Sequence, residues 1–163
     1  MFTIGDYIVK SGEGVCRITE TVYMDSMDGE KLPYYLLSPV QDSRSTVYIP
    51  VSGAYRDVRA VMQKQDAEAL IASIPEIRAL SVDTEKQREQ TYKDVIRSCD
   101  PGRLVGLLKY MCIRSAERRS LGKKNTAMDD RYMKLAENAL YSELAFVLES
   151  DASDVRDAIA SSV

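Results

Sequence analysis

The sequence contains no histidine and no tryptophan, and only three of its 163 residues are cysteines. Histidine is the side chain whose ordinary pKa lies near neutrality and the commonest metal ligand, so its absence argues against most hydrolases and metalloenzymes. The spacing of Cys16, Cys99 and Cys112 matches neither a zinc site nor a disulfide framework, and we expect free thiols in a reducing cytosol. The sequence therefore predicts no enzyme, no catalytic residues, no metal and no cofactor.

Long apolar runs are also missing. No stretch of about 18 apolar residues could form a membrane span. Residues 1–6 lack the basic and apolar regions of a secretory signal. We therefore expect a cytoplasmic protein that has no membrane partner and no small-molecule substrate.

Charge is distributed unevenly along the chain. The formal net charge is −3, but residues 84–134 carry 13 basic and 7 acidic side chains, while residues 135–163 carry 1 and 6. The distribution of charge is more informative about binding partners than the net charge, because a basic segment can bind an anionic partner whatever charge the rest of the chain carries. Residues 84–134 are therefore the candidate region for contact with phosphates.

The N-terminal part follows the pattern of short β-strands separated by turns. Four segments are rich in strand-forming residues: 4–9, 15–22, 33–37 and 46–51. In the second of them, Cys16, Ile18 and Val22 are expected to share one face of the strand. Several short strands of this kind predict a small barrel or a strongly bent sheet.

After about residue 60 the hydrophobic period becomes helical. Five helical segments are expected: 65–74, 84–98, 101–120, 126–147 and a short one from 153. Asp100 and Pro101 give the clearest start, because aspartate caps a helix and proline suits its first position. Thr126 followed by Asp129 resembles a capping box. The chain is thus expected to be α+β, with a β domain at 1–60 and a bundle of about five helices at 61–163.

Seven cations lie within 21 residues around the junction of two predicted helices: Arg114, Arg118, Arg119, Lys123, Lys124, Arg131 and Lys134. One interpretation is a solvated surface, since cations near a helix C-terminus are favoured by the helix dipole. The other is contact with phosphates, because clustered arginine and lysine beside a helix N-terminus form a good anion surface. Composition alone does not decide between the two.

The order of motifs resembles one family. The line Met1-Phe2-Thr3-Ile4-Gly5-Asp6-Tyr7-Ile8-Val9, followed by Gly12-Glu13-Gly14-Val15, is similar to the F-x-x-G-D-x-V-V-Y-P-x-x-G-V opening of the CarD/CdnL transcription regulators. Lys10-Ser11 replaces Tyr-Pro, whereas 34–37 and 46–51 look like the third and fourth strands of that family.

The helical part resembles the same family. Ser98-Cys99-Asp100 is similar to its S-G-D motif before a long helix. Residues 129–136 and Glu143-Leu144-Ala145 are similar to its E-x-R-M-L-x-x-A…E-L-A helix, with Asp129 in place of the glutamate. The resemblance extends over nearly the whole chain to about residue 150.

The resemblance implies a Tudor-like N-terminal β-barrel that binds the RNA polymerase β subunit, largely by pairing an exposed strand edge with it. The matching polymerase-binding positions are Met24, Asp25, Ser26, Val47 and Tyr48. Family members often carry an arginine near these positions, and this chain does not.

The resemblance also implies that the helical domain lies on promoter DNA without reading its sequence and changes the stability of the open complex. Family members place a tryptophan near the start of the second helix, where Glu85 stands in this chain. The expected DNA-binding residues, which include the loop and helix cations, are Lys86, Arg88, Lys93, Arg114, Arg118, Arg119, Lys123, Lys124 and Arg131. The alternative is a polymerase-binding adaptor with little or no DNA affinity.

Overall fold

The N-terminal part forms one antiparallel sheet in the computed structural model, which describes residues 2–53, 55–151 and 153–163. Its strands are β1 (Tyr7–Lys10), β2 (Gly14–Asp25), β3 (Lys31–Pro39), β4 (Val47–Pro50) and β5 (Val58–Ala60), in the order β4-β3-β2-β1-β5. The edge strands β4 and β5 are not paired with each other, so the sheet is bent but open. The expected closure into a barrel is therefore wrong, whereas the α+β class is confirmed.

A β-bulge in β2 changes which side chains face the sheet's core. Ile18 pairs with Leu37 but Glu20 pairs with Leu36, so one extra residue, Thr19, lies in β2. An extra residue reverses the alternation of faces beyond it. Cys16 and Ile18 are buried as expected, but Val22 lies on the opposite face, and the prediction that it shares their face was wrong.

The core of the sheet is closed partly by segments outside the strands. Tyr35 is buried, and its hydroxyl donates to the carbonyl oxygen of Phe2 at 2.5 Å. The Phe2 ring lies 5.9 Å from that of Tyr55, and both pack on the buried cluster around Ile8 and Leu37. Phe2 and Tyr55 thus cover part of the sheet's apolar core. In a closed barrel, strands would cover this core instead.

The helices follow the sheet and are α1 (Lys64–Ser73), α2 (Arg88–Ser98), α3 (Pro101–Ser120), α4 (Ala127–Leu148) and α5 (Ser153–Ser161). Short 3₁₀ turns lie at η1 (Ile74–Glu76) and η2 (Glu85–Gln87). The caps predicted at Asp100 and Thr126 are present: the Asp100 carboxylate accepts from the Arg103 amide at 3.1 Å, and the Thr126 hydroxyl oxygen accepts from the Asp129 amide at 3.1 Å. The expectation of about five helices is confirmed.

One extended segment between η1 and η2 runs along α3. The Leu80 amide donates to the Gly106 carbonyl at 2.9 Å, and a Cβ atom at Gly106 would lie 3.0 Å from the Arg78 carbonyl oxygen. Lys109 is buried and donates to the carbonyl oxygens of Ile74 and Ile77. Gly106 thus leaves room for the backbone of this segment to lie directly on α3, and Lys109 provides a donor for the carbonyl oxygens of Ile74 and Ile77.

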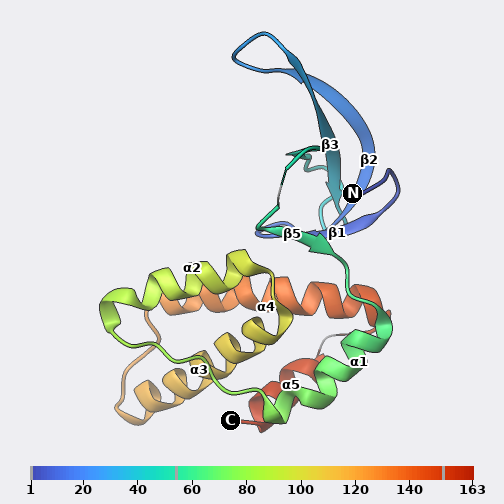
Figure 1. Ribbon diagram of the computed structural model, residues 1–163. Helices are drawn as coiled ribbons and strands as arrows, with labels where there is room; N and C mark the ends of the chain where they lie inside the picture. The colour runs from blue at the N-terminus through green and yellow to red at the C-terminus, as the bar shows by residue number, and fades with distance from the viewer. Residues whose placement is uncertain (1, 54, 152) are drawn as a thin grey trace.

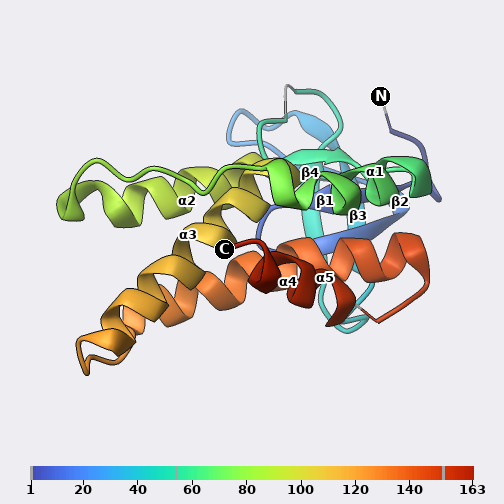
Figure 2. The same cartoon turned by 90° about the horizontal axis from the view of Figure 1, so that it is seen from below.

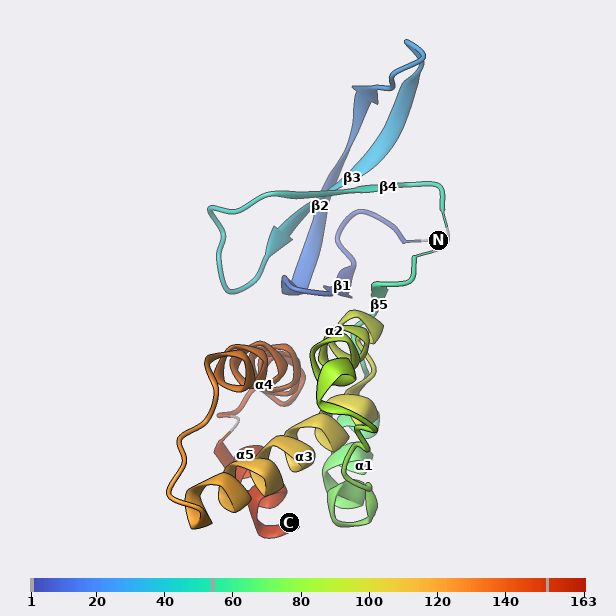
Figure 3. The ribbon, with the colours of Figure 1, turned by 90° about the vertical axis from the view of Figure 1, so that its left-hand side faces the viewer.

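Helix α4 lies against the sheet and also packs on the other helices (Figure 1). Figure 3 shows the β2–β3 hairpin projecting away from the helical side of the molecule. In the described part of the chain, no helix is long and apolar enough to cross a membrane.

Candidate functional site

Strand β4 leaves one edge of the sheet open. The Val51 amide donates to the Pro33 carbonyl at 3.0 Å, which fixes the phase of the β3–β4 ladder. Because bonded and non-bonded pairs alternate along an antiparallel ladder, the N–H and C=O of Tyr48 point away from β3. The described part of the chain offers neither group a partner, and the Tyr48 side chain is exposed.

The open edge is short because Pro50 limits it. Pro50 occupies the next outward-facing position and has no N–H, and its carbonyl oxygen accepts from the Tyr55 hydroxyl. Proline on an edge strand restricts uncontrolled pairing with other strands. The structure therefore leaves Tyr48 as the centre of a limited pairing site.

The β2–β3 hairpin carries the other predicted polymerase-binding residues, Met24, Asp25 and Ser26. Met24 and Asp25 end β2, and the Ser26 amide donates to the Glu30 carbonyl at 2.8 Å in the turn. Three large apolar side chains near the tip are exposed: Tyr23, Met27 and Leu32. The structure places the tip of this hairpin beyond β4, on the part of the sheet farthest from the helices (Figure 3).

A partly buried ion pair joins the sheet to α4. Arg59 in β5 donates to both carboxylate oxygens of Glu143, at 2.7 and 2.5 Å, and its Nε donates to the Cys99 carbonyl at 2.7 Å. The Met62 amide donates to the same carboxylate at 3.1 Å. Burial alone would lower the pKa of Arg59, but the contact with Glu143 outweighs it and the pKa lies above its ordinary value.

Apolar contacts surround this ion pair. Val9, Val15 and Cys99 form a buried cluster with Val61 and Phe146 packed against it. Together with the Arg59–Glu143 pair, the cluster fixes the sheet on α4.

The predicted DNA-binding residues gather at one end of the helical region. Six of them are exposed there: Lys86, Lys93, Arg119, Lys123, Lys124 and Arg131. Figure 2 shows that the start of α2 and the α3–α4 junction both extend beyond the sheet on the same side. The Nε of Arg118 donates to the Lys124 carbonyl at 2.9 Å, so Arg118 also holds the connecting loop.

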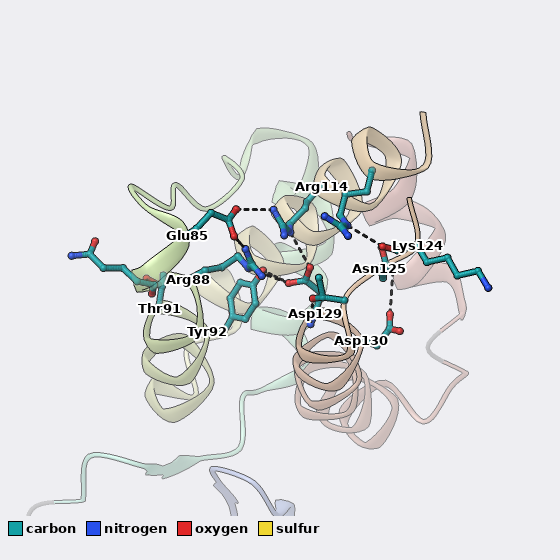
Figure 4. A network of polar contacts seen from close by, with 12 residues as sticks. Glu85, Arg88, Thr91, Tyr92, Arg114, Lys124, Asn125, Asp129 and Asp130 are labelled. Carbon is teal, nitrogen blue, oxygen red and sulfur yellow. Dashed lines mark hydrogen bonds and ion pairs between the residues drawn. The ribbon is translucent and has the colours of Figure 1, made fainter. Parts of the chain in front are cut away.

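Arg88 and Arg114, the other two predicted residues, take part in internal ion pairs (Figure 4). The Nε of Arg114 lies 2.9 Å from an oxygen of Asp129, and the Nε of Arg88 lies 3.3 Å from the other oxygen. Both guanidinium groups also contact Glu85. Burial raises the pKa of Asp129, but hydrogen bonds from Arg114 and Tyr92 outweigh it and hold the pKa below its ordinary value.

All three cysteines are free thiols, as the sequence predicted. Burial raises the pKa of Cys16 to about 11 and raises those of Cys99 and Cys112 above their ordinary value. These thiols are therefore protonated at neutral pH.

Sequence reasoning missed β5 and the Arg59–Glu143 pair. A three-residue strand has too short a pattern to detect, and an arginine partner 84 residues away leaves no local signal. Glu143 was noticed only as part of a motif, and its near-complete burial was not foreseen.

Comparison with protein families finds a match over the N-terminal part of the chain. Residues 2–62 match the family model of the CarD-like/TRCF RID domain, a domain type that interacts with RNA polymerase. The N-terminal part of the chain is therefore similar to RID domains over residues 2–62. A helical region follows it, an arrangement consistent with a CarD-like protein. A search of curated proteins found no match to the chain.

Proposed function

We propose that this protein is a transcription regulator that binds the β subunit of RNA polymerase through its RID domain and contacts promoter DNA through its helices, changing open-complex stability. The division into a polymerase-binding unit at 1–60 and a DNA-binding unit at 61–163 belongs to this proposal. The observation that carries it is the open edge at Tyr48 on a RID domain fixed to helices with a basic end.

The polymerase contact is proposed at Tyr48 and the β2–β3 hairpin. Unpaired backbone groups on an edge strand bind an extended segment of another protein by strand addition. Tyr48 provides one N–H and one C=O for this pairing, and the exposed Met27 and Leu32 add apolar surface. Val47 holds the strand to β3 through its pairing with Leu37.

The DNA contact is proposed at the basic end of the helical region. Helix α4 reaches from this end, at Ala127, to the sheet contact at Glu143, about 24 Å away at 1.5 Å per residue. A polymerase-bound sheet would therefore hold the exposed cations at a fixed distance from the polymerase. Lysine and arginine side chains suit phosphates, so we propose binding without sequence readout.

A salt titration of binding to duplex DNA tests this contact. Replacing Arg119 and Lys123 with glutamine removes two exposed cations. The negative slope of log K against log salt should then become shallower by about 0.9 for each lost phosphate contact. A matched control replaces Lys31 and Lys64, which are exposed elsewhere, with glutamine. Equal slopes for the two double variants would contradict the proposed surface.

An adaptor with little DNA affinity is the second candidate. The internal ion pairs of Arg88 and Arg114 favour it, because these guanidinium groups are occupied in the free protein. No measurable DNA affinity at low salt, even with polymerase present, would favour the adaptor over the regulator.

A further inference from the structure

Four charged residues meet where the start of α2, the second half of α3 and the first turn of α4 come together (Figure 4). Arg114 lies 3.1 Å from Glu85 through Nη1 and 2.9 Å from Asp129 through Nε. Arg88 contacts the same two carboxylates, Asp129 at 3.3 Å and Glu85 more closely. Each arginine therefore contacts both carboxylates, that of Asp129 and that of Glu85.

The two carboxylates are held very differently. The Asp129 side chain is 8% exposed, and the Tyr92 hydroxyl donates to it at 2.8 Å. The Glu85 side chain is 73% exposed and lies on the 3₁₀ turn η2, whose N-cap Thr84 makes no side-chain hydrogen bond. Within the described chain, the recorded partners of the Glu85 carboxylate are the two arginines alone. Asp129 is thus a fixed part of the cluster, and Glu85 can leave it.

Departure of Glu85 would leave a positively charged site. The two guanidinium groups and Asp129 then carry a net charge of +1, and the side of the arginines facing Glu85 loses its acceptor. The Nε and Nη1 atoms of Arg88 are enclosed and lack a hydrogen bond of good geometry within the described residues. Enclosed donors of this kind favour a replacement anion, because a buried donor left without an acceptor is costly.

We infer that Arg88 and Arg114 form a site for a phosphate group, which the Glu85 carboxylate occupies in the free protein. Guanidinium groups bind phosphate oxygens as they bind carboxylates, through paired N–H donors. The expected occupant is a phosphodiester of the DNA backbone, so the inference rests on the proposed DNA contact. Glu85 then competes with the DNA and weakens binding by the free protein.

Glu85→Gln tests the competition, and Glu89→Gln is its matched control. Glu89 lies one helical turn further along, pairs with Lys93 at 3.6 Å and accepts from the Tyr132 hydroxyl at 2.9 Å, away from both arginines. The two variants change the net charge equally. Duplex DNA should bind Glu85→Gln roughly fivefold more tightly than Glu89→Gln, since two ion pairs no longer oppose binding. The slope of log K against log salt should also be steeper by about one.

A further variant tests the role of the paired N–H donors of the Arg114 guanidinium group. Adding Arg114→Lys to Glu85→Gln keeps a positive charge beside Asp129 but removes the paired donors. The gain in DNA affinity should then be lost. Retention of the full gain in this double variant would overturn the assignment of Arg114.

Inorganic phosphate provides a test of the site that does not use DNA. Phosphate added to Glu85→Gln should shift the NMR signals of the Arg88 and Arg114 Nε–H groups, and the same additions to Glu89→Gln should not. If this shift occurs but no variant binds DNA, the phosphate site stands and the DNA function fails. If the wild-type protein binds DNA while both variants behave alike and phosphate shifts neither arginine, the site is refuted and the proposed function stands.

Discussion

Breaking the Arg59–Glu143 ion pair should cost a large part of the protein's stability. The loss should depend on which of the two residues is replaced. Glu143 is 1% exposed, whereas the Arg59 side chain is 27% exposed. Arg59→Gln leaves a buried carboxylate with the Met62 amide as its remaining donor, and we expect a loss of about 3–5 kcal/mol. Glu143→Gln leaves an arginine that can reach water, so its loss should be smaller, about 2 kcal/mol.

Urea unfolding of the full chain at pH 7 measures both values. The double variant, Arg59→Gln with Glu143→Gln, removes both charges and should be more stable than Arg59→Gln alone. A loss below about 1 kcal/mol in Arg59→Gln, or strict additivity in the double variant, would refute this reasoning.

Two further changes follow from contacts among the helices. The pKa of Asp129 is lowered in the folded protein, so its ionised form stabilises the fold above the unfolded pKa of about 3.9, and this stabilisation is lost as pH falls through the folded pKa. Asp129→Asn should therefore flatten the acid side of the urea-derived stability curve, and an unchanged curve would contradict the role of the cluster. Gly106→Ala should cost about 1–3 kcal/mol, because its Cβ would lie 3.0 Å from the Arg78 carbonyl oxygen, whereas Gly122→Asn, at an exposed left-handed turn, should cost less than 1 kcal/mol in thermal unfolding.

Local signals predicted much of the fold. Asp100 with Pro101, and Thr126 with Asp129, set helix starts that the structure confirms, because a cap depends on residues three positions apart. The bulge at Thr19 was not predicted, since β-formers continue through it without a break. Closure of the barrel depended on pairing between β4 and β5, which no local pattern determines.

The candidate surfaces were predicted in part. Charge counting along 84–134 found the basic stretch. The structure brings the start of α2 and the α3–α4 junction, near which six of the predicted cations are exposed, to the same side of the molecule (Figure 2). Charge counting could not distinguish Arg88 and Arg114 from the exposed cations, because the burial of these two arginines depends on their contacts with Asp129 and Glu85 in other elements. The DNA-binding role of the whole set stays a prediction.

The affinity of the full chain for RNA polymerase, measured for Tyr48→Pro against Tyr48→Ala, tests the strand-edge contact most directly. Both variants remove the tyrosine ring, but only proline removes the outward N–H, and the β3–β4 ladder does not use that group. Polymerase should bind Tyr48→Pro at least tenfold more weakly than Tyr48→Ala, with similar melting temperatures for the two. Equal affinities would show that polymerase does not pair with this edge.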